Sequence, residues 1–216
     1  AVFYFSSRPT NFLLSPGMTS ALVMYALIPM AIMFYVLIMS SLELFRHRPC
    51  PIEQIGKGML GMAWILVPLL VLAAFVRLCP AFVLAFFLLI WVYDTFAYLG
   101  GSMYGRTKMC EKISPKKTWE GTFTGFIVTV IVAVLFTSIP FFYVLQVPTW
   151  AWAAYAVIIV VFGTLGDLLE SLFKRNAGVK DSGNAMPGHG GILDRFDSIL
   201  FAAFPAMLFA FLVMLG

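Results

Sequence analysis

Long apolar segments constrain what this chain can fold into more than any other feature. The chain is 62% hydrophobic and 11% charged, whereas ordinary soluble domains are about 25% charged. Its apolar segments reach roughly 20 residues, the length that a helix needs to cross a bilayer, and they lack the alternation of a transmembrane barrel strand. The sequence therefore predicts an all-α, polytopic integral membrane helical bundle with six spanning helices, at residues 18–42, 58–78, 81–99, 121–138, 150–170 and 192–215.

Proline residues mark the ends of several of these helices. Pro80 follows the second, and Pro140 and Pro148 bracket the connection between the fourth and the fifth, because proline cannot continue a helix. No internal repeat or low-complexity tract divides the chain, so we expect one membrane-embedded catalytic domain over residues 1–216. The chain begins at Ala1 rather than at a methionine and shows no signal-peptide pattern, which leaves room for a further helix before residue 1.

Lysine and arginine gather in alternate connections between the predicted helices. The connections 43–57, 100–120 and 171–191, counted together with Arg195, hold twelve of the fourteen basic residues. Because loops rich in lysine and arginine stay in the cytoplasm, we predict that these three connections are cytoplasmic. The connection 139–149 carries no charge and is expected on the outer side of the membrane.

Four aspartates lie at or within the predicted spans, all toward the same side. Asp94 sits in the third helix, Asp167 in the fifth, and Asp194 and Asp197 open the sixth, where their spacing puts them on one helical face. A carboxylate in hydrocarbon is costly unless it is paired, hydrated or bound to a cation. Because oxygen ligands suit hard cations and no histidine or cysteine cluster is present, the four predict a Mg²⁺ site, with a second monovalent or divalent cation left open.

Basic residues and glycines accompany these acids along the chain. The basic side chains suit phosphate groups, and the glycines let backbone N–H groups approach an anion closely. They are Lys116, Lys117, Lys174, Arg175, Lys180 and Arg195, with Gly183, Gly188, Gly190 and Gly191. Acids for a metal, cations for phosphoryl oxygens and a glycine-rich loop favour phosphoryl or nucleotidyl transfer rather than nucleic-acid binding.

Each of these residues also has a simpler interpretation. Asp94 alone fits half of an ion pair, and Asp194 and Asp197 fit acids that complement a helix dipole. The pair Lys116–Lys117 fits an orientation signal, and His189 fits a phosphate contact, a turn residue or a catalytic base. An ion-coupled transporter is the main alternative of another class, because intramembrane aspartates also bind Na⁺ or protons. Transporters usually contain repeated halves, however, and no repeat is visible here.

Two stretches carry a specific pattern. The first reads SLFKR-x4-KDSG-x3-PGHGGILDRFD over residues 171–197, and the second reads DTFAYLGG-x2-YGR over residues 94–106, followed by SPKKTWEG at 114–121. Their order and residues closely resemble the phosphatidate cytidylyltransferases, also called CDP-diacylglycerol synthases. The helical layout agrees with that family over most of the chain. The departure is at the N-terminus, where the family usually has further spanning helices.

The resemblance implies transfer of a cytidylyl group from CTP to phosphatidic acid, giving CDP-diacylglycerol and pyrophosphate for phospholipid synthesis. It implies Asp167 and Asp194 as the main ligands of Mg²⁺, with Asp94 and Asp197 supporting the site. The remaining roles that it implies are catalysis by Asp167, Asp194, Asp197, Lys174, Arg175 and Lys180, and substrate binding by Ser114, Lys116, Lys117, Ser171, Asp181, His189 and Arg195.

The partners that follow are CTP, phosphatidic acid and membrane lipid, and the sequence leaves open whether the chain forms a homodimer. A related CTP-dependent enzyme that acts on another lipid, either a polyprenol kinase or an archaeal-lipid cytidylyltransferase, is the nearest alternative. The compact chain favours a bacterial plasma (inner) membrane, with the active site facing the cytoplasm.

Overall fold

The structure is a computed structural model that describes residues 30, 32–43, 45, 50–179, 182–183, 191 and 193–215. Residues up to Ala63 and residues from Trp64 onward form two compact units, which are taken in turn. Helix α2 (Pro51–Leu78) contributes residues to both units.

The first unit contains the helix Ile32–Glu43 and the beginning of α2. Gly58 of α2 faces the earlier helix, because a Cβ atom there would stand 3.3 Å from the hydroxyl of Tyr35. Glu53 and Lys57, one turn apart on α2, form an ion pair of 2.7 Å. This spacing is the one at which opposite charges meet on a helix surface, so the first turns of α2 are helical although they are polar.

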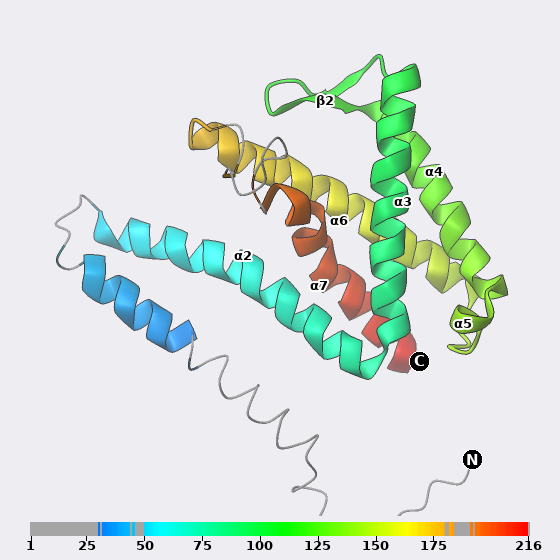
Figure 1. The fold of residues 1–216 in the computed structure, drawn as a ribbon, viewed down its shortest axis with the longest axis horizontal. Helices are drawn as coiled ribbons and strands as arrows, with labels where there is room; N and C mark the ends of the chain where they lie inside the picture. Colours follow the sequence, from blue (N-terminus) through cyan, green and yellow to red (C-terminus); the bar gives the residue numbers. More distant parts are fainter. Residues whose placement is uncertain are drawn as a thin grey trace, which may run out of the picture. The chain divides into compact units, whose positions relative to one another are not determined.

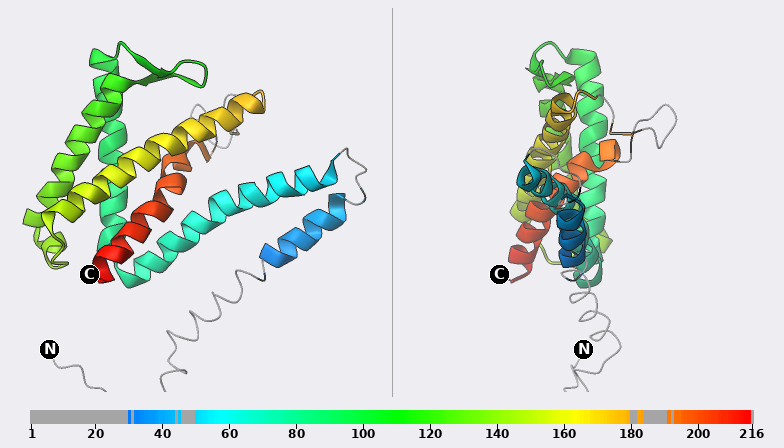
Figure 2. Two further views of the ribbon diagram at one scale, coloured as in Figure 1. Left: turned by 180° about the vertical axis from the view of Figure 1, so that it is seen from behind. Right: turned by 90° about the vertical axis from the view of Figure 1, so that its left-hand side faces the viewer.

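The second unit is a bundle of four further long helices with one small hairpin (Figures 1 and 2). Helix α3 lies along α4, α6 lies along α7, and α4 also packs against α6. The hairpin joins α3 to α4, and its two strands are antiparallel, with Lys108 opposite Thr118. In chain order the elements are α3 (Pro80–Tyr104), β1 (Lys108–Cys110), β2 (Ser114–Thr118), α4 (Trp119–Leu135), a 3₁₀ turn (Phe136–Ser138), α5 (Pro140–Tyr143), α6 (Thr149–Asn176) and α7 (Leu193–Leu215).

Glycines bring α3 and α4 close together. A Cβ atom at Gly121 would lie 2.5 Å from the carbonyl oxygen of Ala97, and one at Gly125 would lie 2.9 Å from the Tyr93 side chain. Small residues at such spacings let the backbones of membrane helices approach, which is how these helices associate without a hydrophobic driving force. The GxxxG pattern of α4 is therefore a packing surface, and it fixes the helix that carries Asp94.

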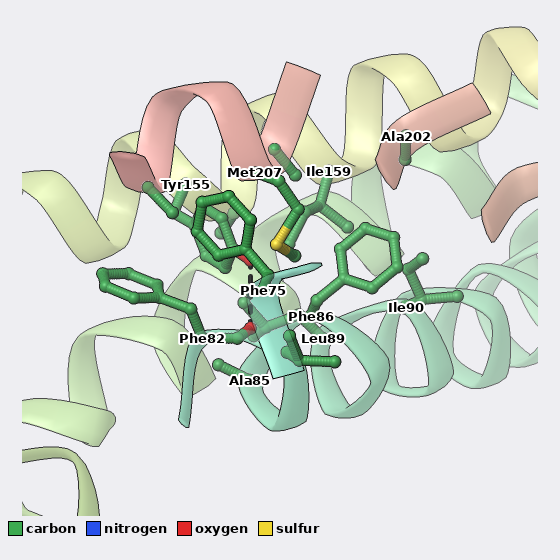
Figure 3. Close-up of a cluster of buried hydrophobic side chains, with 14 of the residues drawn as sticks. Phe75, Phe82, Ala85, Phe86, Leu89, Ile90, Tyr155, Ile159, Ala202 and Met207 are labelled. Carbon is green, nitrogen blue, oxygen red and sulfur yellow. Dashed lines mark hydrogen bonds between the residues drawn. The ribbon is translucent and has the colours of Figure 1, made fainter. Parts of the chain in front are cut away.

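The core of this unit lies in the half of the bundle that is away from the hairpin. Side chains from α2, α3, α6 and α7 interdigitate there, with Phe86, Tyr155 and Met207 fully buried (Figure 3). The one polar group of Tyr155 is satisfied, because its hydroxyl donates a hydrogen bond of 3.1 Å to the carbonyl oxygen of Phe82. The four helices thus share one apolar core that sets their relative positions.

Five helices of the described residues are long and apolar enough to cross a membrane: Ile52–Leu78, Pro80–Tyr104, Trp119–Ser138, Thr149–Asn176 and Leu193–Leu215. They correspond to five of the six spans expected from the sequence, and the all-α membrane fold is confirmed. The remaining expected span, 18–42, lies largely outside the described residues, which show only the shorter apolar helix Ile32–Glu43.

Several boundaries expected from the sequence were wrong. Helix α2 begins at Pro51 rather than at residue 58, α3 continues to Tyr104, and α6 continues to Asn176. The connection 100–120 is not an irregular loop, because it contains the end of α3 and the hairpin, and α5 lies within 139–149. The physical reason is that hydropathy marks only the apolar part of a helix, whereas backbone hydrogen bonding continues the helix into polar residues.

Candidate active site

One cavity of about 650 Å³ lies at the hairpin side of the second unit. Its wall is built from α3, the hairpin, α4, α6 and α7, so residues far apart in the sequence meet around it. The charged side chains on this wall are Asp94, Lys108, Lys116, Lys117, Asp167, Lys174, Asp194, Arg195 and Asp197. All four aspartates singled out in the sequence therefore line the same cavity, together with five cations.

Local structure places the hairpin on this cavity. Thr118 ends β2 and caps α4, because its hydroxyl oxygen accepts the backbone N–H of Gly121 at 3.3 Å. At the same open end of the hairpin, just before β1, both oxygens of the Glu120 carboxylate accept the backbone N–H of Thr107, at 3.0 and 3.1 Å. These contacts tie both strand ends to the first turn of α4, which directs Lys116 and Lys117 to the cavity.

The first charged contact of the cavity joins the hairpin to α6. The Nζ atom of Lys117 lies 2.6 Å from Oδ2 of Asp167, and both side chains are mostly shielded, at 20% and 31% exposure. An ion pair at this depth is less screened than a surface pair. Asp94 and Asp197 line the same cavity as this ion pair. Three acidic side chains from three helices thus share the cavity with Lys117.

The second charged contact joins α6 to α7. Lys174 lies 2.6 Å from Oε2 of Glu170 and 2.8 Å from Oδ1 of Asp194. Asp194 also accepts backbone N–H groups, from Ser182 at 3.0 Å and from Gly191 at 2.7 Å. Ser182 and Gly191 flank residues 183–190, which we call the glycine-rich segment. Asp194, at the start of α7, therefore holds the backbone on both sides of that segment.

The other residues expected from the sequence divide into three groups. Lys116, Arg195 and Asp197 line the cavity, whereas Ser114, Ser171 and Arg175 are not on its wall. Arg175 instead donates hydrogen bonds to the carbonyl oxygens of Ile113, at 3.4 Å, and Val179, at 3.5 Å. The last group, Lys180, Asp181 and His189, lies outside the described residues.

Glu170 is the site residue that the sequence analysis missed. Its side chain is buried, at 3% exposure, and its Oε1 atom has no hydrogen-bond partner among the residues described. The signal that could have found it is helical spacing, because Asp167, Glu170 and Lys174 recur at three and four residues and so share one face of α6. Glu170 lies just before the first residue of the sequence pattern and was taken only as a helix end.

The donor set of the cavity fits a magnesium ion. The acidic side chains offer only carboxylate oxygens, and Mg²⁺ is commonly held by one or two carboxylates together with substrate phosphates and water. Within the described ranges, no three acidic, histidine or cysteine side chains are arranged as a ready metal cluster. Asp167 and Asp194 pair with lysines instead, so the role of the four aspartates as metal ligands stays a prediction.

The fold and this cavity define an integral membrane protein of the helical class, with acidic and basic side chains gathered at one side of its bundle. Sequence comparison makes the assignment more specific. Residues 3–214 match the family described as the cytidylyltransferase family, and the chain belongs to that family.

Individual relatives agree with this assignment. The chain is 47% identical over 120 residues to the phosphatidate cytidylyltransferase of Staphylococcus haemolyticus, which covers 56% of this chain and 45% of that protein. The proteins of the same name from Staphylococcus epidermidis, at 45% identity, and Staphylococcus aureus, at 47% identity, are covered to the same extent. The match thus spans about half the length of these relatives.

Proposed function

We propose that this protein transfers a cytidylyl group from CTP to phosphatidic acid, giving CDP-diacylglycerol and pyrophosphate. The observation that carries the proposal is the single cavity on which Asp94, Asp167, Asp194 and Asp197 meet five basic side chains. Membership of the cytidylyltransferase family and the name of the staphylococcal relatives support the same reaction. A cavity in a membrane bundle suits a reaction between a soluble nucleotide and a lipid phosphate.

The proposed reaction is an in-line displacement. A phosphate oxygen of phosphatidic acid attacks the α-phosphorus of CTP and forms a new phosphorus–oxygen bond. The bond from the α-phosphorus to the oxygen that bridges to the β-phosphate breaks, and pyrophosphate leaves with that oxygen and its electron pair. Lys108, Lys116 and Arg195 would stabilise the charge that builds on the leaving pyrophosphate, since fixed cations act strongly in a shielded site.

A bound Mg²⁺ would neutralise charge on the phosphoryl oxygens and hold the nucleotide in line. The carboxylates that would hold it are those of Asp167 and Asp194, the pair that the sequence pattern implies, with Asp94 and Asp197 beside them on the same cavity wall. Asp194 would also contribute by holding Lys174 and the backbone at Ser182 and Gly191, which keeps the flanks of the glycine-rich segment at the cavity.

The placement of the lysines and arginines supports a cytoplasmic cavity. The hairpin, the end of α6 and the start of α7 carry seven of the ten basic residues that the structure describes, and such segments stay in the cytoplasm. CTP is present there, so the nucleotide would enter from water and the lipid from the surrounding leaflet. The staphylococcal relatives are bacterial proteins, which supports a bacterial plasma membrane.

The proposal is tested by label transfer with the purified protein in detergent micelles that contain phosphatidic acid, Mg²⁺ and CTP labelled at the α-phosphorus. We expect the label to appear in a lipid product and unlabelled pyrophosphate to be released in equal amount. Parallel reactions with CTP labelled at the γ-phosphorus and with a polyprenol acceptor separate this reaction from a kinase. Label in lipid only from γ-labelled CTP, or no transfer with any acceptor, would contradict the proposal.

The variant Asp194→Asn sharpens this test. Asn cannot provide the negative charge that pairs with Lys174, so we expect label transfer to fall by about 100-fold or more, the usual loss when a charged group at a reaction centre is removed. The protein should remain folded in detergent, as measured by its elution volume and thermal unfolding. Arg46→Ala is the control, because Arg46 lies in the connection 43–57, whose basic residues the sequence analysis uses only to orient the chain in the membrane. Near-normal transfer by Asp194→Asn would refute a role of Asp194 in the reaction.

A further inference from the structure

Lys117 stands where a cation is needed. Its Nζ atom is 2.6 Å from Oδ2 of Asp167. Asp94 and Asp197 line the same cavity, and carboxylates that gather away from water are stabilised by a nearby cation. The ammonium group supplies that charge in the structure.

We propose that Lys117 is a built-in substitute for the metal ion: it holds Asp167 when no metal is bound, and it is displaced from Asp167 when Mg²⁺ binds. The inference rests on the proposed function and adds to it a competition between one lysine of this chain and the ion. It follows from occupancy, because Oδ2 of Asp167 cannot keep an ammonium group at 2.6 Å and accept a metal ion on the same side.

The position of Lys117 on the hairpin gives the displacement a use. Lys117 is in β2, whose end is fixed through Thr118 to the first turn of α4, so the lysine can leave Asp167 and still lie on the cavity wall. A released ammonium group beside a bound metal then meets the phosphate oxygens that arrive with the nucleotide. The ammonium group of Lys117 thus pairs with Asp167 before the metal binds and with substrate phosphate afterwards.

Lys174 provides the internal contrast. It is held by two carboxylates, those of Glu170 and Asp194, at 2.6 and 2.8 Å. Glu170 is buried and belongs to the same helix, so losing Lys174 would leave a buried charge uncompensated, which is strongly unfavourable. Lys174 is therefore a fixed part of the structure, whereas Lys117 has one short ion pair among the described residues, with Asp167, that a metal ion can replace.

The test measures Mg²⁺ binding without any nucleotide or lipid substrate. Thermal unfolding of the detergent-solubilised protein is followed while Mg²⁺ is titrated, since an ion that binds only the folded state raises its stability. We expect Lys117→Gln to be less stable than the unmodified protein without Mg²⁺, and to reach half of the full Mg²⁺ effect at about fivefold lower concentration, the factor that corresponds to losing one competing ion pair. Lys116→Gln, on the same strand and cavity, is the matched control and should titrate like the unmodified protein.

A second measurement follows Lys117 itself. Acylation by an amine-reactive reagent, read out by mass spectrometry of the peptides, should increase at Lys117 when Mg²⁺ is added, because the amine is released from Asp167. Acylation at Lys116 should not change. In Asp167→Asn, Lys117 should react equally with and without Mg²⁺.

Three results would overturn the inference: the same Mg²⁺ midpoint for Lys117→Gln and the unmodified protein, a higher midpoint for the variant, or no Mg²⁺ effect on either. These results are distinct from a failure of the proposed function, which is shown by the absence of label transfer from CTP to phosphatidic acid in the unmodified protein. If the unmodified protein transfers the label but has the same Mg²⁺ midpoint as Lys117→Gln, the proposed function stands. Only the proposed competition between Lys117 and Mg²⁺ is then wrong.

Discussion

Helices α6 and α7 are built differently in their two halves. Away from the hairpin, they meet through an apolar face on which Tyr155, Ile159 and Met207 are fully buried (Figure 3). Toward the hairpin, the same two helices meet through Lys174 and Asp194. The two halves therefore have different roles. The apolar half fixes the distance between the helices and their rotation. The charged side chains of the polar half then occupy positions that this packing determines.

Small residues make the apolar half dense. The buried face of α7 carries four alanines, Ala202, Ala203, Ala206 and Ala210, all fully shielded. Small side chains allow close backbone approach, which is the main source of association between membrane helices. A cavity for charged substrates can then open at the polar half without loosening the bundle, since the helices are already held elsewhere.

The largest effect is expected at Gly166, where the two halves of α6 meet. A Cβ atom there would lie 2.6 Å from Cβ of Phe201 and 2.7 Å from the carbonyl oxygen of Asp197. Gly166→Ala should therefore push α7 away, destabilise the fold by about 1–3 kcal/mol, the usual cost of overpacking, and displace Asp197. We expect label transfer to fall by about 100-fold, as a misplacement of about 1 Å can cause.

Gly163→Ala is the matched control for this prediction, because its new Cβ atom would only make an ordinary contact of 3.7 Å with Ser198. Thermal unfolding and label transfer are measured on both variants. Similar activity of the two variants would mean that the spacing of α6 and α7 does not position the carboxylates. The proposed roles of the apolar and polar halves would then be wrong.

In the apolar half, the expected effect is on stability and not on activity. Met207 is fully buried, whereas the adjacent Leu208 is 48% exposed. Met207→Ala should cost about 2–5 kcal/mol through the cavity that it leaves, whereas Leu208→Ala should change stability little. The activity per folded molecule should be the same in both variants, since neither residue reaches the cavity wall. Loss of activity in folded Met207→Ala protein would show that packing in the apolar half also affects the positions of the charged side chains in the cavity.

These comparisons explain how much of the fold could be predicted from the sequence. The spanning helices were predictable because membrane thickness sets their length and composition. The last turns of α6, around Lys174, were not predictable. Their charged residues are typical of a loop, but here they pair along one face of the helix. The hairpin was missed for a related reason: KMC and SPKKT have no apolar alternation, and their pairing depends on contacts with α4.

The candidate site was partly predictable as well. The four aspartates could be grouped from the sequence because a carboxylate in a membrane span is energetically costly unless it is paired, hydrated or bound to a cation. The pairing of Lys117 with Asp167 could not be predicted, since it depends on how the hairpin returns over α6. Glu170 was missed because its burial results from packing and not from a pattern in the sequence.

The smallest effect is expected at Arg175, where the sequence pattern and the structure differ. The resemblance implies a catalytic role, but the side chain makes two long hydrogen bonds, of 3.4 and 3.5 Å, to carbonyl oxygens and is not on the cavity wall. Arg175→Ala should therefore reduce label transfer only about threefold, because the two hydrogen bonds that it loses are long and weak. Lys174→Ala, its neighbour on the wall, should reduce transfer far more because Asp194 and buried Glu170 lose their cation. Equal and large losses in both variants would place Arg175 on the substrate, and the polar half of the bundle would then extend beyond the cavity seen here.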